Sequence, residues 1–115
     1  MPLGLPEVEG MLESIAEARD ILPGEVHLQL PPNLWPLQRL GEALEAGIDD
    51  LGGIDQWDVI NPAYPQPSPS VLARQLERDG WQLCPRLCVH EAWLPWLPSA
   101  LRPHAETLRQ RLGAC

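Results

Sequence analysis

Amide side chains stand on both sides of a proline pair near the start of the chain, and amides bind ligands through hydrogen bonds. Gln29 precedes Pro31 and Pro32, and Asn33 follows them. Proline cannot continue a β-ladder because it lacks the backbone N–H, so the pair ends a short apolar strand predicted over residues 26–30. Two roles are open for Gln29 and Asn33: they hydrogen-bond a ligand, or they hold the bend.

Carboxylates followed by glycines form a second candidate group. Asp49 and Asp50 lie in a short segment predicted to be a strand buried on both faces, and Gly52 and Gly53 come soon after. A buried charge persists only with a partner or beside a wet ligand site. One carboxylate is therefore expected either to point into a ligand site or to cap backbone amides of the glycine turn. Glycine also lets the backbone approach a ligand closely, and α/β folds place ligand-binding loops at the carboxyl ends of parallel strands.

The cysteines suggest a metal site at first sight. Cys84 and Cys88 have the first spacing of a CxxxCxxC iron–sulfur motif, but Glu91 occupies the third ligand position. We interpret both cysteines as structural, small apolar residues partly buried near a strand end. The alternative is a mixed site with His90 and Cys115, which zinc chemistry allows. The odd number of cysteines predicts no disulfide framework and fits a reducing compartment.

Apolar periodicity and turn residues predict helices alternating with strands. The helices are predicted over residues 7–21, 37–46, 68–80 and 101–112, and the strands over residues 26–30, 48–51 and 81–87. Strands joined through helices are parallel, with right-handed crossovers. The fold class is therefore predicted to be α/β, with about three parallel strands and flanking helices.

Composition excludes several classes of function. Lys and Arg number 8 against 16 Asp and Glu, a net charge of −8, which argues against nucleic acid because phosphates need a basic surface. No apolar run approaches the ~20 residues of a membrane span and no signal region is evident, so we expect a cytoplasmic chain with no membrane partner. The 115 residues are well short of the roughly 250 of a closed (β/α)8 barrel.

Three motifs in fixed order resemble a known enzyme family. They are QLPPNL at residues 29–34, EAGIDDLGGI at residues 45–54, and NPxYPxP at residues 61–67. Together they are similar to the carboxyl-terminal third of the radical SAM subunit of FO (7,8-didemethyl-8-hydroxy-5-deazariboflavin) synthase, which makes the chromophore of a deazaflavin coenzyme. Less distinctive agreement extends the resemblance over roughly residues 6–100.

The resemblance implies the last βα units of a radical SAM (β/α) partial TIM barrel, with residues 1–115 as one partial domain and residues 1–5 and 113–115 as disordered ends. In this family a 4Fe-4S cluster on a CxxxCxxC loop cleaves S-adenosylmethionine, and the resulting radical couples a tyrosine-derived unit to a ribityl-diaminouracil. This chain lacks that loop, so it is not expected to hold either cofactor or to be active alone. The residues implied to line the open end of the barrel, near S-adenosylmethionine and substrate, are Gln29, Asn33, Asp50, Gly52, Gly53 and Asn61.

The chain departs from the family pattern in the loop implied to face substrate. Asp55 and Gln56 replace the usual Ser-Pro, Ala63 replaces an acidic residue, and Gln66 replaces an aromatic residue or His. The expected partner is the missing amino-terminal radical SAM portion or a second synthase subunit. The alternative is a stand-alone, non-catalytic α/β binding or assembly fragment that has lost the iron–sulfur domain. Self-association is expected under either hypothesis, because three parallel strands leave two edges open.

Overall fold

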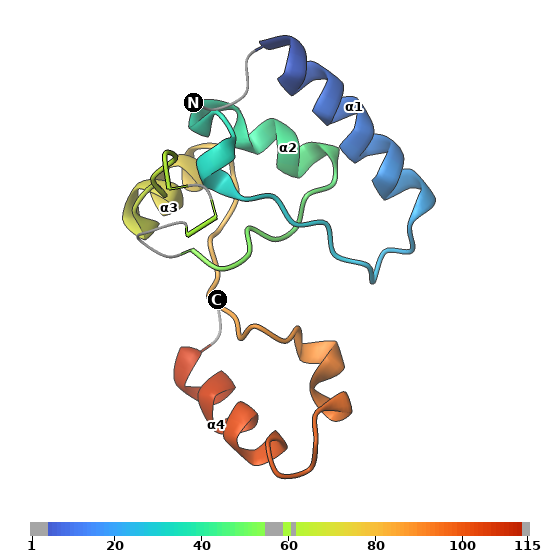
Figure 1. Ribbon diagram of the computed structural model, residues 1–115, viewed down its shortest axis with the longest axis vertical. Helices are drawn as coiled ribbons and strands as arrows, with labels where there is room; N and C mark the ends of the chain where they lie inside the picture. Colours follow the sequence, from blue (N-terminus) through green and yellow to red (C-terminus); the bar gives the residue numbers. More distant parts are fainter. Residues whose placement is uncertain (1–4, 55–58, 61, 114–115) are drawn as a thin grey trace. The chain divides into compact units, whose positions relative to one another are not determined.

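The computed structural model describes residues 5–54, 59–60 and 62–113, which fall in two compact units, Met1–Trp81 and Gln82–Cys115 (Figure 1). The first unit holds the α-helices α1 (Leu5–Ile21), α2 (Leu40–Ala46) and α3 (Pro69–Arg78), and the 3-10 helices η1 (Pro32–Leu34) and η2 (Leu37–Arg39). The second unit holds the 3-10 helix η3 (Glu91–Trp96) and α4 (Arg102–Leu112). Of the ends predicted to be disordered, residues 1–4 and 114–115 lie outside the described residues.

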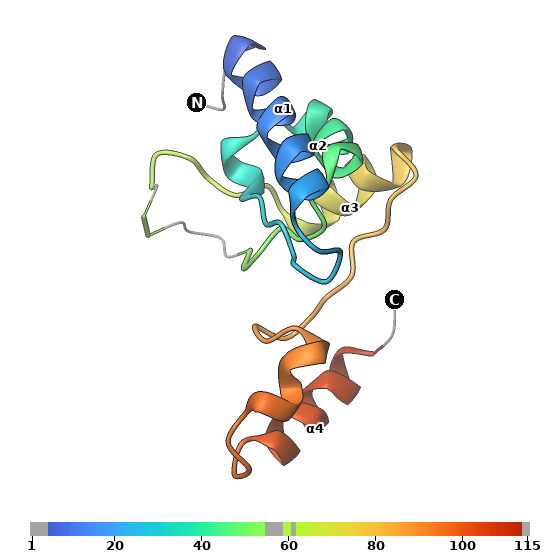
Figure 2. The ribbon, with the colours of Figure 1, turned by 90° about the vertical axis from the view of Figure 1, so that its right-hand side faces the viewer.

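The helices form where the apolar periodicity predicts them. α1 lies along α2 in both ribbon views (Figures 1 and 2). Ser68 caps α3 by accepting a hydrogen bond from the Val71 N–H at 3.3 Å, as a serine before a first-turn proline indicates. The helices and their connections bury one apolar core in the first unit, made by Val8, Ile15, Trp35, Leu40, Ala43, Ile48, Leu51, Leu72 and Leu76.

The predicted strands are not confirmed, since the described residues contain no β-strand. Residues 26–30 and 48–51 meet through one isolated parallel bridge between Gln29 and Asp50. The Leu30 N–H donates to the Asp50 carbonyl at 3.0 Å, and the Asp49 N–H donates to the Leu28 carbonyl at 3.1 Å. Residues 81–87 have no regular secondary structure. A parallel ladder is stable when further strands and covering helices flank it, and two short segments supply neither.

The parallel sense of this bridge is nevertheless informative. Both segments run the same way past Gln29 and Asp50, so the proline pair and Gly52 follow the bridge at the same end. The bridge therefore brings the two sequence regions with candidate ligand-binding residues to one edge of the first unit.

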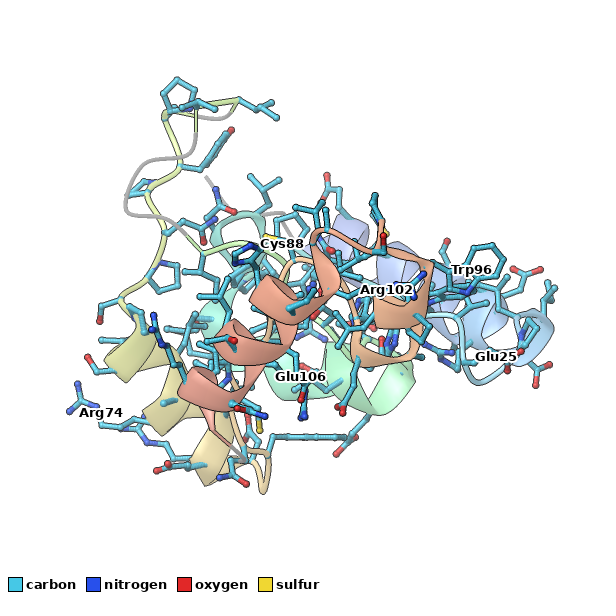
Figure 3. All side chains as sticks on the ribbon, turned by 90° about the horizontal axis from the view of Figure 1, so that it is seen from below. Glu25, Arg74, Cys88, Trp96, Arg102 and Glu106 are labelled. Carbon is cyan, nitrogen blue, oxygen red and sulfur yellow. The ribbon has the colours of Figure 1, made fainter. Side chains whose placement is uncertain are left out.

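The second unit has a different character, because none of its described residues is buried. Trp93 and Trp96 in η3 contact each other with ring centroids 5.8 Å apart and planes tilted by 54°. Arg109 of α4 pairs with Glu106 on its own helix and with Glu91 of η3, the latter at 3.4 Å. Figure 3 labels Cys88 and Trp96, whose side chains are exposed. No helix within the described ranges is both long and apolar enough to cross a membrane.

Arg39 connects α1 to the first turn of α2, and we expect its contact with Glu42 to weaken in acid. Its guanidinium bonds Glu42 through Nε at 2.6 Å and also reaches Glu9. The hydrogen bond from Arg39 holds the pKa of the Glu42 carboxyl below its ordinary value. A carboxyl with a lowered folded-state pKa contributes stability above its unfolded pKa and loses that contribution as the pH falls through the folded pKa.

We therefore expect Arg39→Met to be less stable than the wild type at about pH 7, and this difference to shrink as the pH falls below the ordinary Glu pKa of 4.5 and Glu42 becomes protonated. Urea unfolding followed by circular dichroism across that range measures it. Arg74→Met is the matched control, because Arg74 is exposed on α3 and its removal takes no partner from Glu42. A stability difference for Arg39→Met that stays constant across the range would contradict the prediction.

Candidate functional site

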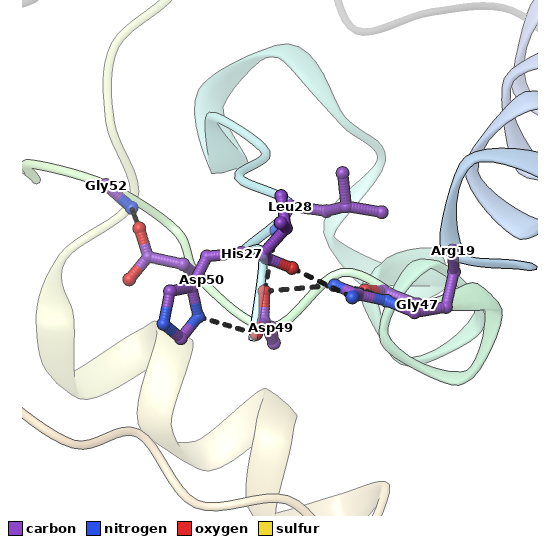
Figure 4. Close-up of polar contacts among 8 residues, drawn as sticks. Arg19, His27, Leu28, Gly47, Asp49, Asp50 and Gly52 are labelled. Carbon is purple, nitrogen blue, oxygen red and sulfur yellow. Dashed lines mark hydrogen bonds and ion pairs between the residues drawn. The ribbon is translucent and has the colours of Figure 1, made fainter. Parts of the chain in front are cut away.

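Three of the predicted site residues come together at the end of the parallel bridge. Asp50 accepts a hydrogen bond from the Gly52 N–H on its Oδ2 atom at 3.0 Å (Figure 4). Gly52 has a φ of +76°, and a Cβ atom placed there would lie 2.4 Å from the Gln29 Nε2 atom. The Gln29 side chain therefore lies directly against the Gly52 backbone. Asp50 caps the glycine turn, which is one of the two roles that the sequence left open for it.

The other predicted residues have different surroundings. Asn33 is only 6% exposed and donates from Nδ2 to the Tyr64 carbonyl at 2.9 Å, so it ties η1 to the proline-rich loop. Gly53 is exposed, and a Cβ atom added there would meet nothing within 4 Å. Asn61 lies outside the described residues, as do Asp55 and Gln56.

The neighbouring carboxylate faces another set of partners, because successive side chains of an extended segment point to opposite faces. Asp49 accepts from the Leu28 N–H on Oδ1 at 2.8 Å and contacts the His27 Nδ1 atom through Oδ2 at 2.7 Å. Arg19, near the end of α1, approaches the same carboxylate at 3.6 Å. Sequence reasoning missed Arg19. The sequence feature that could have indicated Arg19 is its position as a single basic residue in the last turn of an otherwise acidic helix.

The cysteines do not fit an iron–sulfur cluster. A cluster needs convergent thiolates, whereas Cys88 is an exposed free cysteine and Cys84 is disulfide-bonded. In the part of the chain that the structure describes, no group of three His, Cys, Asp or Glu residues could hold a metal ion. The prediction of no disulfide framework did not anticipate the bond at Cys84. The exposure of both residues corrects the expectation that they are partly buried.

A pocket of about 450 Å³ lies within the second unit, and Cys84 is one of the residues that line it. Apolar side chains line much of it, including Leu87, Val89 and Leu94, and Arg109 and Glu91 contribute polar groups. The Arg109 guanidinium is already paired with Glu91 and with Glu106, and the hydrogen bond from Arg109 lowers the pKa of Glu106. The carboxylates of Glu91 and Glu106 therefore compensate the Arg109 cation, and Arg86 is a second cation in the lining of the pocket.

Comparison with known proteins points to one kind of enzyme, a deazaflavin-forming synthase. The chain is 46% identical over 110 residues to the 7,8-didemethyl-8-hydroxy-5-deazariboflavin synthase of Trichodesmium erythraeum, a match covering 95% of this chain and 33% of that protein. It is 40% identical over 114 residues to the synthase of the same name from Gloeobacter violaceus, covering 96% and 33%. The match to the Thermosynechococcus vestitus synthase is 44% over 86 residues, covering 74% and 27%.

These matches confirm the resemblance to the carboxyl-terminal part of FO synthase. The chain spans about a third of the length of the curated relatives it matches. The similarity indicates a portion of a radical SAM fold, although the described residues are mostly helical. No family model matches the chain, and no solved structure matches it.

Proposed function

We propose that this chain is the carboxyl-terminal part of a radical SAM FO synthase and supplies loops on the substrate side of its barrel. The observation that carries the proposal is the 46% identity over nearly the whole chain to a protein with that name. The parallel bridge supports it, because Gln29, Asp50 and Gly52 meet at the carboxyl end of two parallel segments, where such barrels bind ligands. In the whole protein, residues 26–30, 48–51 and 81–87 would be the last strands of the partial barrel, and residues 1–115 part of its single domain.

In this proposal, the cofactors of the family would be held by the part of a synthase that this chain does not match. The S-adenosylmethionine and 4Fe-4S cluster of the family would supply a radical on the substrate when bound. The described residues do not fit the cluster, so the remaining part of a synthase would hold it, in one polypeptide with this sequence or as a separate subunit. Gln29 would offer an amide and Asp50 a carboxylate toward S-adenosylmethionine or the ribityl-diaminouracil and tyrosine-derived substrates. The chain would work in the cytoplasm.

Complementation tests the proposal. The Trichodesmium erythraeum synthase, shortened by the third that this chain matches, is co-expressed with the 115-residue chain. We expect FO fluorescence and 5′-deoxyadenosine to form only when both parts are present. The shortened synthase alone is the negative control and the intact synthase is the positive control. An intact synthase that is active beside an inactive pair would favour the alternative, a non-catalytic fragment.

Asp50→Asn separates a functional carboxylate from a structural one. Asparagine retains an oxygen that can accept the Gly52 N–H, but it lacks the negative charge. We expect FO formation by the complemented pair to fall about tenfold, the size of effect that losing one hydrogen bond to a charged group gives. Asp20→Asn, at an exposed position of α1, is the matched control. FO formation and S-adenosylmethionine cleavage both at wild-type rates would show that Asp50 only caps the turn.

A further inference from the structure

We propose that Arg19 and Asp49 are positioning residues that fix the register of the two segments carrying Gln29 and Asp50. Their function as positioning residues rests on the proposed function of that edge. The contacts themselves stand independently of it. Arg19 is not among the predicted site residues, and Asp49 is the one of the two candidate carboxylates that does not face the glycine turn.

Arg19 joins the two segments through their carbonyl groups. Its Nη1 atom donates to the Val26 carbonyl at 2.8 Å, while Nε and Nη2 donate to the Gly47 carbonyl at 3.2 and 3.0 Å (Figure 4). Val26 precedes Gln29 by three residues, and Gly47 precedes Asp50 by three residues. The guanidinium therefore links two positions that are equally far from the bridged pair, Gln29 and Asp50. It adds side-chain hydrogen bonds to the backbone hydrogen bonds of the bridge.

Asp49 joins the same segments in the opposite direction. Its carboxylate accepts from the Leu28 N–H at 2.8 Å and contacts His27 at 2.7 Å, so one side chain of the second segment holds two consecutive residues of the first. Its ion pair with Arg19 is partly exposed, with side-chain exposures of 25% and 40%, and such pairs are worth little by their charges alone. The directed bonds to backbone groups are what specify the register.

Gly47 lets Arg19 come this close. A Cβ atom at Gly47 would lie 2.6 Å from the Arg19 Cβ atom, and the Gly47 φ of +138° disfavours any other residue. The carbonyl of Gly47 is thereby presented to the guanidinium at the end of α2.

The consequence concerns Asp50. A shift of one residue between the two segments would turn Asp50 to the face now taken by Asp49, because the side-chain period of an extended segment is two. A single bridge with its backbone hydrogen bonds specifies register weakly. The bonds of Arg19 and Asp49 therefore select the pairing in which Asp50 caps Gly52 beside Gln29.

Amide hydrogen exchange in the 115-residue chain tests the register directly. In Arg19→Met we expect protection of the Leu30 and Asp49 amides to fall about tenfold relative to the Leu72 amide of α3, because bonds from a charged donor are lost. Arg19→Lys keeps the charge without the fork and should restore part of the protection. Arg74→Met, whose side chain projects from α3 in Figure 3, should leave all three amides unchanged. Equal loss at all three amides in Arg19→Met, or no loss, would overturn the proposal.

The complemented synthase supplies the functional readout. We expect Arg19→Met to raise KM for the ribityl-diaminouracil substrate about tenfold, since the contact residues are misplaced, with a smaller change in kcat. If the wild-type pair is active and Arg19→Met leaves KM and kcat unchanged, then Arg19 is not a positioning residue. The proposed function would be unaffected by that result. An inactive wild-type pair would overturn the proposed function instead, and the exchange measurement then decides the register alone.

Discussion

Trp35→Ala is expected to lower the free energy of unfolding of the first unit by about 3–5 kcal/mol, the usual cost of removing a buried large aromatic side chain. Trp35 is 2% exposed and is among the largest fully buried side chains. Its indole Nε1 donates to the Arg39 carbonyl at 3.0 Å, so the truncation also removes a partner of that carbonyl. Urea unfolding followed by far-ultraviolet circular dichroism measures the change.

Two further variants make the Trp35 prediction specific. Trp35→Phe retains most of the apolar contact but loses the indole N–H, and we expect it to cost about 1–3 kcal/mol. This variant remains informative if Trp35→Ala does not fold. Trp81→Ala is the matched control, since Trp81 is 38% exposed. Equal losses of stability for Trp35→Ala and Trp81→Ala would contradict the assignment of Trp35 to the core.

Gly52→Ala is expected to cost about 1–3 kcal/mol, because alanine at a left-handed φ is strained. The Gly52 φ is +76°, and its new Cβ atom would also meet the Gln29 side chain at 2.4 Å. Gly53→Ala is the matched control from the next position. Its Cβ atom would meet nothing within 4 Å and its φ is not in the left-handed range, so its stability should stay close to that of the wild type.

A double variant separates the two causes at Gly52. Gln29→Ala removes the side chain that the new Cβ atom would strike. If the collision contributes, Gly52→Ala should cost less in the Gln29→Ala background than in the wild type, and the remaining cost is the backbone strain. Gly52→Ala and Gly53→Ala with the same stability would show that the turn does not need its left-handed residue.

Much of this fold and site could be predicted because the signals are local. The apolar spacing of α1 and the Ser68–Pro69 start of α3 depend on residues within a few positions of one another. The family resemblance likewise rests on short contiguous motifs, and the comparisons confirm it. The predicted strands are not confirmed beyond the single parallel bridge, because a ladder depends on neighbours that are distant in sequence.

The amino-acid sequence alone indicates where the four α-helices lie to within a few residues and which enzyme family the chain resembles. The packing of distant segments settles which of two adjacent carboxylates faces the glycine turn: Asp50 caps Gly52, while Asp49 contacts His27 and Leu28. It also brought Arg19 to a carbonyl 28 residues away. Helix propensity and turn chemistry depend on residues that are close in sequence. The pairing register, and the side to which each carboxylate points, are fixed only when distant segments pack together.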